Sequence, residues 1–269
     1  MMFYRYIVLL VGVLFSVPCW SFSSGLGTGV GASFPTGLNV VVGYTNPELE
    51  SAWLRRLGVR FDFATTGPLK SAIDSIIDNA MSNGQDIGDG IEITDGKLDA
   101  KHLSAVVDVY PFVDSSYFDG VRISGGYYFG DMHMDTSIKG QIAEISPDRF
   151  YFYLDGTHYY YNGNNFRGMT EIDWEYNGPY LGLGWDIKLG CGFYLYTDIG
   201  AVFTNRPPTL TINIPHQQLY TYNNTTGVWE PFTIPKLDSD VANAQRDANH
   251  KLADLRILPM VKVGFLYRF

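Results

Sequence analysis

Apolar residues alternate with polar or small residues along several segments, most regularly at the C-terminus. Every odd position from Leu255 to Phe269 is apolar or aromatic, whereas the even positions include Arg256, Lys262 and Arg268. Successive side chains of a β-strand point to opposite faces, so this segment predicts a strand with one wholly apolar face. Strands of transmembrane β-barrels have this pattern, because one face meets lipid and the other faces the lumen.

The same alternation predicts seven further strands and therefore an all-β, antiparallel transmembrane barrel of eight strands. Gly25–Ser33 and Leu38–Tyr44 flank a turn at Pro35-Thr36-Gly37. The others cover residues 53–65, 101–112, 119–132, 178–188 and 191–204, before the last strand at 255–269. The connections alternate between short, near 46–51, 111–117 and 189–190, and long, at 66–100, 133–177 and 205–254. Outer-membrane barrels alternate short periplasmic turns with long extracellular loops in this way, which supports a count of eight.

The first 21 residues predict a cleaved secretory signal peptide. Arg5 supplies the positive charge, Tyr6–Val17 is a short apolar stretch, and small residues before Phe22 place cleavage after Ser21. Residues 22–269 are then a single unit, an outer-membrane barrel with large extracellular loops.

Composition excludes several other classes of protein. Charged residues make up 17% of the chain and aromatic residues 15%, with 29 glycines, whereas soluble domains carry about 25% charge. Beyond the N-terminus no apolar stretch is long enough for a transmembrane helix. The net charge of −9 argues against nucleic acid as a partner, because binding to phosphates needs clustered Lys and Arg.

The long connections predict some structure of their own. In 66–100, Pro68 and a stripe of Leu69, Ile73, Ile76, Ile77 and Ala80 predict a helix that ends at Asn83-Gly84. We expect it to pack on the barrel rim, with a helix lying on the membrane surface as the alternative. The acidic stretch 86–99 does not match the EF-hand spacing, so calcium binding stays open, and we predict no metal site and no cofactor.

Aromatic runs surround Asp155-Gly156 in the second long connection, which predicts a hairpin over Phe150–Tyr161. It suits contact with sugar, protein or lipopolysaccharide, or it extends barrel strands above the membrane; if it crossed the membrane, the barrel would have ten strands. The third connection predicts an extended run at Leu210–Ile214, a hairpin at Tyr220–Phe232 and a helix at Leu237–Leu252.

Nine charged residues fall on the inward face of the predicted strands. They are Arg56, Arg60, Asp62, Asp108, Arg122, Asp186, Asp198, Lys262 and Arg268. An eight-stranded barrel is only wide enough for its own side chains, so buried charges there must pair. We expect an ion-pair network that fills the lumen, although a narrow gated ion path would use the same residues.

Catalysis is not expected. His102 and Ser104 share a strand face and superficially resemble the His-x-Ser pair of lipid A deacylase barrels. Their face is predicted to point inward, whereas a lipid substrate would approach from outside. The other histidines are scattered over the loops.

Phe265, Tyr267 and Phe269 resemble the C-terminal signature of Gram-negative outer-membrane barrels, which implies recognition by the barrel assembly machinery. The whole pattern resembles the small OmpA-type and OmpW-type barrels, including a bacterial subgroup with runs like Ser104–Phe112, Pro179–Trp185 and Tyr267-Arg268-Phe269. The resemblance implies an outer-membrane location and contact with lipid and lipopolysaccharide, but no single activity. We expect a structural or surface-interaction role through the outer loops, with a surface ligand unknown. The alternative is a narrow channel or porin-like carrier for ions or small apolar molecules.

Overall fold

The computed structural model describes residues 25–46, 49–81, 85–86, 91–115, 117–143, 146–162, 168–215, 219–223, 225–231 and 234–269. The predicted signal peptide lies outside these residues. The barrel strands are β1 (Leu26–Phe34), β2 (Gly37–Thr45), β3 (Leu57–Thr65), β5 (Ile91–Val109), β6 (Val121–Ala143), β10 (Gly178–Gly190), β11 (Phe193–Phe203) and β15 (Ile257–Arg268). The remaining strands are β4 (Gln85–Asp86), β7 (Ser146–Leu154), β8 (Thr157–Asn162), β9 (Gly168–Glu175), β12 (Thr209–Asn213), β13 (Leu219–Asn223) and β14 (Val228–Pro231). The helical segments are η1 (Leu54–Arg56), η2 (Gly67–Leu69), α2 (Lys70–Met81) and α3 (Ile234–Leu252).

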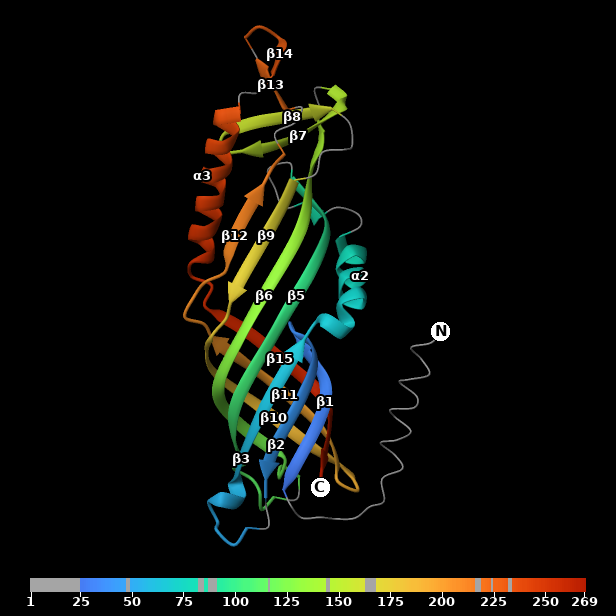
Figure 1. Cartoon of the computed structure of the whole chain (residues 1–269), viewed down its shortest axis with the longest axis vertical. Helices are drawn as coiled ribbons and strands as arrows, with labels where there is room; N and C mark the ends of the chain where they lie inside the picture. Colours follow the sequence, from blue (N-terminus) through green and yellow to red (C-terminus); the bar gives the residue numbers. More distant parts are fainter. Residues whose placement is uncertain are drawn as a thin grey trace, which may run out of the picture.

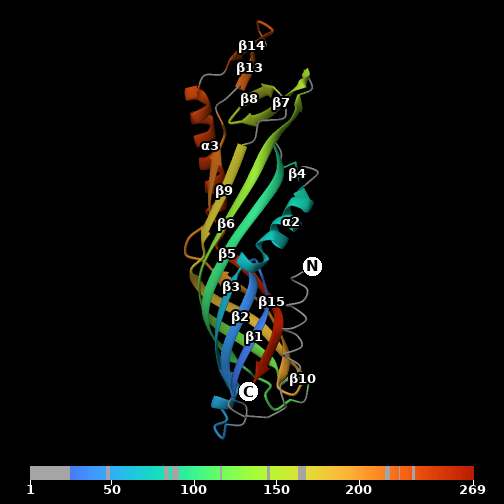
Figure 2. The same cartoon turned by 45° about the vertical axis from the view of Figure 1, so that its right-hand side comes forward.

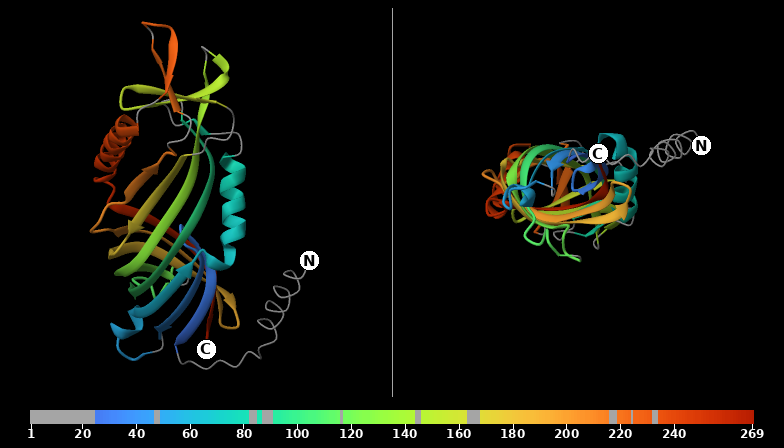
Figure 3. Two further views of the ribbon diagram at one scale, coloured as in Figure 1. Left: turned by 45° about the horizontal axis from the view of Figure 1, so that its top comes forward. Right: turned by 90° about the horizontal axis from the view of Figure 1, so that it is seen from below.

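Eight antiparallel strands close a ring, which confirms the predicted fold class. Neighbours in the ring follow the order β1, β2, β3, β5, β6, β10, β11 and β15, and β15 pairs back with β1, from Gly27 opposite Arg268 to Phe34 opposite Val261. Seen from below, the strands enclose the barrel axis (Figure 3). We call the end with the C-terminus and the short turns the short-loop end, and the opposite end the long-loop end (Figure 1).

The outer surface of the ring is apolar. In its rows, Phe61, Leu103, Leu181, Ile199 and Val261 are 47–64% exposed in this structure. Alternate residues, such as Asp62, Ser104 and Asp198, point inward and are buried. A surface of this kind suits the hydrocarbon of a bilayer, since closure of the ring leaves no unpaired strand edge in lipid.

β5 and β6 are much longer than predicted. β6 pairs with β10 over Val121–Tyr128 and with β9 over Asp131–Ile138, and β12 pairs with β9. Above the ring, β5, β6, β9 and β12 therefore form a sheet that rises from one side of the barrel, which we call the upper sheet (Figure 2). Residues 91–100 and 133–143, expected to be loop, are strand. From Lys101 back to Asp95 and from His133 to Ser137 the period of two continues with mostly charged outward residues, up to an irregularity between Ile93 and Asp95.

A helix lies along each edge of the upper sheet (Figure 2). α2 packs beside β5 and α3 beside β12, so the predicted helices in the first and third long connections are confirmed. Side chains of each helix bond to the backbone of its neighbouring strand, which covers edges that would otherwise expose unpaired N–H and C=O groups. Neither helix is long and apolar enough to span a membrane, over the described residues.

β7, β8, β13 and β14 form a second sheet, the tip sheet, which continues from the upper end of β6. Asp155 and Gly156 adopt positive φ angles of 43° and 80° in the β7–β8 turn, as a tight hairpin requires. This hairpin lies beyond the ring, so the barrel has eight strands and not ten. One face of the tip sheet packs with β12 and α3 in a second hydrophobic core formed by Phe152, Leu154, Tyr159, Tyr161, Ile214, Leu219 and Leu237.

Candidate functional site

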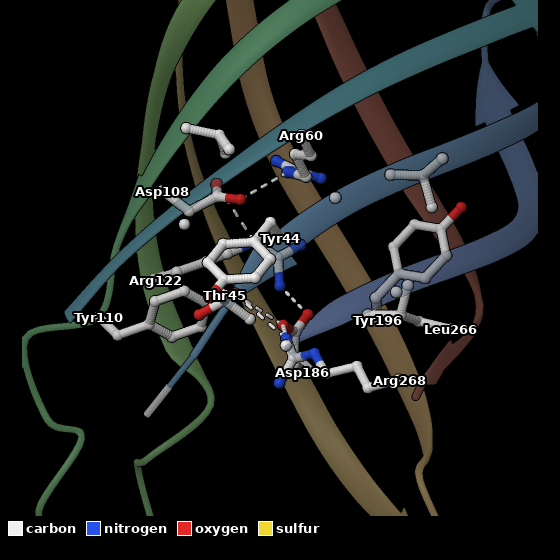
Figure 4. A pocket seen from close by; sticks show the side chains of 16 residues that line it. Tyr44, Thr45, Arg60, Asp108, Tyr110, Arg122, Asp186, Tyr196, Leu266 and Arg268 are labelled. Atoms are coloured by element: carbon white, nitrogen blue, oxygen red, sulfur yellow. Dashed lines mark hydrogen bonds and ion pairs between the residues drawn. The ribbon is translucent and has the colours of Figure 1, made fainter. Parts of the chain in front are cut away.

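A network of ion pairs fills the short-loop half of the lumen (Figure 4). Arg60 on β3 donates from Nε to Asp108 Oδ2 at 2.7 Å and from Nη1 to Asp198 Oδ2 at 2.8 Å. These side chains come from β3, β5 and β11, so the network ties strands across the barrel. All three are buried.

Arg122 on β6 extends this network toward the short-loop end. Its guanidinium pairs with Asp198 at 2.8 Å and with Asp186 on β10. Arg268 also pairs with Asp186, and the Tyr110 hydroxyl donates to the same carboxylate at 2.9 Å. Each carboxylate therefore accepts from several donors, which offsets the cost of removing its charge from water.

A separate pair lies farther toward the long-loop end. Lys262 Nζ on β15 is 3.3 Å from Asp62 Oδ2 on β3, and the Ser104 hydroxyl donates to Asp62 at 3.1 Å. Lys262 also lies 5.0 Å from the centre of the Tyr128 ring. Together with the network, the lumen holds four cations and four carboxylates, so its formal charge is zero.

Eight of the nine charges that the sequence places inside the barrel line the lumen, and Arg56 does not. Arg56 ends η1, at the short-loop end, and pairs with Asp114 at 3.2 Å. The predicted strand 53–65 is wrong at its start, because residues 54–56 form a short 3-10 helix before β3 begins. Because Arg56 belongs to this helix and not to β3, the alternation of the strand does not point its side chain into the lumen.

Tyrosine rings packed against glycines fill the space that the charges leave. A methyl group added at Gly31 would lie 2.6 Å from the Tyr196 hydroxyl, and one at Gly264 would lie 2.7 Å from the same ring. The Tyr196 hydroxyl donates to Asn39 at 2.7 Å. Sequence reasoning missed this packing, although the signal is present as glycines at alternate, inward positions of β1.

Small cavities remain beside the network. One of about 90 Å³ lies at the short-loop end, beside Tyr110, Asp186 and Arg268. A cavity of about 30 Å³ lies between Val41, Gly43, Arg60, Tyr196 and Leu266 (Figure 4). A buried water needs roughly 10–15 Å³ of such volume, so this cavity of about 30 Å³ has room for water and for nothing larger.

A cluster of large side chains closes the lumen toward the long-loop end. Trp174 in β9 and Tyr176 just after it pack with Tyr180, Val202, Leu258 and Met260 from the ring strands. All are buried. The lumen is therefore blocked at two levels, by ion pairs near the short-loop end and by this apolar cluster near the other.

His102 and Ser104 both point into the lumen, as predicted, but they do not form a catalytic pair. The Ser104 hydroxyl donates to Asp62, whereas neither ring nitrogen of His102 has a hydrogen-bond partner in the described part of the chain. The His102 ring instead lies 4.9 Å from that of Tyr128. Over the described residues, no group of three His, Cys, Asp or Glu side chains could hold a metal ion; residues 87–90 of the acidic stretch lie outside them.

The three C-terminal aromatic residues lie on the outward face of β15 at the short-loop end. Phe265 is 59% and Phe269 45% exposed, and the Tyr267 ring lies 4.8 Å from Phe193 and 5.1 Å from Phe269. Aromatic rings at this level match the girdle that barrels place at the membrane interface. Recognition of these residues during assembly stays a prediction.

Comparison with known proteins supports the fold. The chain matches no protein-family model and no curated protein sequence. Its structure is similar to CarO from Acinetobacter baumannii, with a TM-score of 0.54 and 14% identity over 90% of this chain and 97% of CarO. CarO2 from the same organism has a TM-score of 0.54 and 15% identity, over 91% and 98% of the two chains.

A major outer membrane protein from Thermus thermophilus was also found, with a TM-score of 0.33 and 14% identity over 91% of this chain and 97% of that one. The finer resemblance to OmpA-type and OmpW-type barrels stays a prediction. At these identities the likeness to the two Acinetobacter proteins concerns the fold alone, and it agrees with the closed ring of eight strands. The chain therefore has the fold of an outer-membrane β-barrel.

Proposed function

We propose that the chain is an integral outer-membrane protein with a sealed lumen that acts at the cell surface through its long-loop half. The observation that carries the proposal is the closure of the lumen at two levels, by paired charges such as Arg60 and Asp198 and by the cluster around Trp174. A pore that conducts ions would need a continuous aqueous path, and the packing at these two levels supports a sealed lumen instead. The upper and tip sheets then provide the surface that contacts partners outside the membrane.

The outer face of the upper sheet, which continues from the lipid-facing rows, carries many charges. His133 lies between two carboxylates, with Nδ1 2.6 Å from Asp173 Oδ1 and Nε2 3.0 Å from Asp135 Oδ1. The hydrogen bond with Asp173 is the main cause that raises the pKa of His133 above its usual value of 6.5. Lys101 pairs with Asp131 at 3.5 Å on the same face. A charged, folded surface of this kind suits contact with polar partners outside the membrane.

We further propose that lipopolysaccharide is a neighbour at the boundary between this face and the membrane. A groove of about 730 Å³ joins the apolar side chains Phe63, Leu103 and Phe129 to the charged groups of Lys101 and Glu175. The apolar end of the groove suits the acyl chains of lipopolysaccharide. The charged end suits its sugars and phosphates, either directly or through divalent cations.

Conductance of the refolded protein tests the sealed lumen. We expect no discrete openings of the unaltered barrel in a planar bilayer. Arg122→Ala, which removes the partner of Asp186 and Asp198, should produce openings or leave the barrel less stable. Arg55→Ala, at a partly exposed position outside the lumen, is the control. Reproducible conductance of the unaltered protein that is lost on altering Arg60 or Arg122 would overturn the proposal.

One observation favours the alternative of a narrow channel. Several buried polar atoms midway along the lumen lack hydrogen-bond partners in the described part of the chain, including those of His102, the Tyr180 hydroxyl and Asn39 Nδ2. Buried polar groups are normally paired with protein or water, so water at this level would supply part of a path. A channel would still require the cluster around Trp174 to move, and the same bilayer recording detects that.

A further inference from the structure

One face of the tip sheet is built almost wholly from aromatic side chains. The strand pairing places alternate residues of the four strands on this face, opposite the face that packs on α3. Its members are Arg149, Tyr151, Tyr153, His158, Tyr160, Tyr220, Tyr222 and Trp229, which we call the aromatic platform. Pro231 is the one aliphatic residue at the described positions of this face.

The rings of the platform are in contact along its length. His158 lies 4.8 Å from Tyr153 and 6.3 Å from Tyr160, measured between ring centres. Tyr160 is 4.9 Å from Trp229, which is 4.8 Å from Tyr222. The result is a continuous stripe of ring surface, each ring about as wide as a sugar ring, at the part of the molecule farthest from the short-loop end (Figure 1).

Arg149 is the only residue of the platform with a permanent charge. Its guanidinium carbon lies 3.9 Å from the centre of the Trp229 ring and 5.2 Å from that of Tyr220. These cation–π contacts fix the plane of the guanidinium. Nη1 is buried without a hydrogen-bond partner, and none of the described carboxylates forms an ion pair with Arg149. The side chain as a whole is half-buried and no described carboxylate neutralises it, so it gives this face of the sheet a fixed positive charge, which is the complement of an acidic group.

We propose that the aromatic platform binds an acidic oligosaccharide, with sugar rings stacked on the tyrosine and tryptophan faces and one carboxylate bonded to Arg149. The C–H face of a sugar ring is weakly positive and suits the negative face of an aromatic ring. The tyrosine hydroxyls can bond to sugar hydroxyls. This inference rests on the proposed surface role and names the ligand class that the surface takes.

The same features disfavour other macromolecules. Nucleic acid would also stack on such rings, but it needs a positively charged groove along its backbone, and the platform offers one cation in a chain of net charge −9. Centres of protein–protein interfaces are also rich in Trp, Tyr and Arg, but there these residues sit in well-packed, desolvated pockets. The platform is an open stripe without aliphatic side chains other than Pro231 at its described positions, so a glycan fits it better.

Titration of the refolded full-length barrel in detergent tests the proposal, with Trp fluorescence and calorimetry as readouts. The probes are a galacturonic acid hexamer, the neutral maltohexaose and inorganic phosphate. We expect Arg149→Gln to weaken binding of the acidic hexamer by about tenfold or more while leaving maltohexaose unchanged. Trp229→Ala should weaken both sugars. Arg246→Gln, an exposed arginine on α3, should change neither, and Trp53→Phe at the short-loop end controls for the fluorescence signal.

Three results would overturn the proposal: no sugar binding by the unaltered protein, equal effects of Arg149→Gln and Arg246→Gln, or phosphate binding as tightly as the hexamer. Heat-modifiable gel migration verifies that each variant is folded, and Arg149→Lys, which keeps the charge without the planar stacking, should bind with intermediate affinity. Absence of glycan binding would overturn this inference but not the proposed function of a sealed barrel that acts at the cell surface. Conductance of the unaltered barrel would instead overturn the proposed function, whatever the sugars do.

Discussion

Asp74 on α2 accepts a hydrogen bond of 3.3 Å from the backbone N–H of Leu98, on the edge of β5 above the ring. One helical turn later, Asp78 accepts from the N–H of Gly96 at 3.3 Å. Four residues of a helix advance about 6 Å and two residues of a strand about 7 Å, so the two spacings match. The helix thus occupies the place of a further strand.

The opposite edge of the upper sheet is covered in the same way. Gln245 and Asn249, again four residues apart on α3, accept from the N–H groups of Ile212 and Leu210 at 3.2 and 2.7 Å. Exposed sheet edges promote association with other chains. By covering both edges, the two helices prevent the upper sheet from pairing with strands of other chains.

Removing the two carboxylates of α2 should free the helix from the sheet. We expect Asp74→Ala combined with Asp78→Ala to lower the local stability of α2 by about 1–2 kcal/mol. Limited proteolysis of the refolded protein should then cut within residues 66–100 faster, with the barrel intact. Asp247→Ala, on an exposed position of α3, should leave the cleavage rate unchanged. Equal rates in all three proteins would show that the hydrogen bonds do not hold the helix.

Removing one member of the buried pair Lys262 and Asp62 should lower the free energy of unfolding far more than replacing both members with apolar residues. Lys262→Met leaves the Asp62 carboxylate buried without its cation, and we expect a loss of roughly 3–5 kcal/mol. Lys262→Met with Asp62→Leu should recover most of that loss, because no buried charge then remains. Equilibrium unfolding by urea in detergent measures both.

The control for that cycle is a partly exposed pair. Arg55→Met removes one of the two arginine partners of Asp114 at the short-loop end and should cost under about 1 kcal/mol. If Lys262→Met were as mild as Arg55→Met, the lumen pair would contribute nothing measurable to stability.

Alternation alone predicted the ring and most of its inward charges, because a residue such as Asp198 is placed by a period of two. The ends of β5 and β6 could not be predicted that way. Lys97, Asp99 and Lys101 keep the alternation, but their charge is typical of a loop as much as of a strand that has left the membrane. Arg56 was misplaced because only the backbone shows that a 3-10 helix precedes β3.

The upper and tip sheets depend on long-range pairing that no local pattern contains. β9 lies beside β12, and β8 beside β13, across connections of many residues. The hairpin turn at Asp155-Gly156 was visible in the sequence. The aromatic platform was not, since it requires the register that places Tyr160 opposite Tyr220.

Stability should depend on pH through His133. Asp173 and Asp135 raise the folded-state pKa of His133 above 6.5, so the protonated form stabilises the fold. That contribution is present in full below about pH 6.5 and is lost as the pH rises through the raised value. The difference in melting temperature between the unaltered protein and His133→Gln should therefore shrink from about pH 5 to pH 8. A constant difference for His133→Gln would contradict the assignment.

Cysteine labelling in intact cells tests the orientation that the loop lengths predict. Cys191 is free and exposed in the short turn between β10 and β11, so a maleimide that cannot cross the outer membrane should not reach it. Thr226→Cys, in the exposed β13–β14 turn, should be labelled in the same cells. Permeabilised cells, in which both should react, provide the control. Labelling of Cys191 in intact cells would reverse the proposed orientation.

Loss of the terminal aromatic residue should affect assembly in cells more than stability. Phe269 is half exposed on the outward face, where its ring lies edge-on to Tyr267, so Phe269→Ala removes little buried surface. If the assembly machinery reads this residue, Phe269→Ala should reduce the fraction of protein that reaches the outer membrane as a folded, heat-modifiable band, yet refold from urea into detergent like the unaltered chain. Phe203→Ala, an equally exposed lipid-facing residue at the long-loop end, should assemble normally. Equal losses for both variants in cells, or a failure of Phe269→Ala to refold, would mean that Phe269 acts through stability and not as a signal.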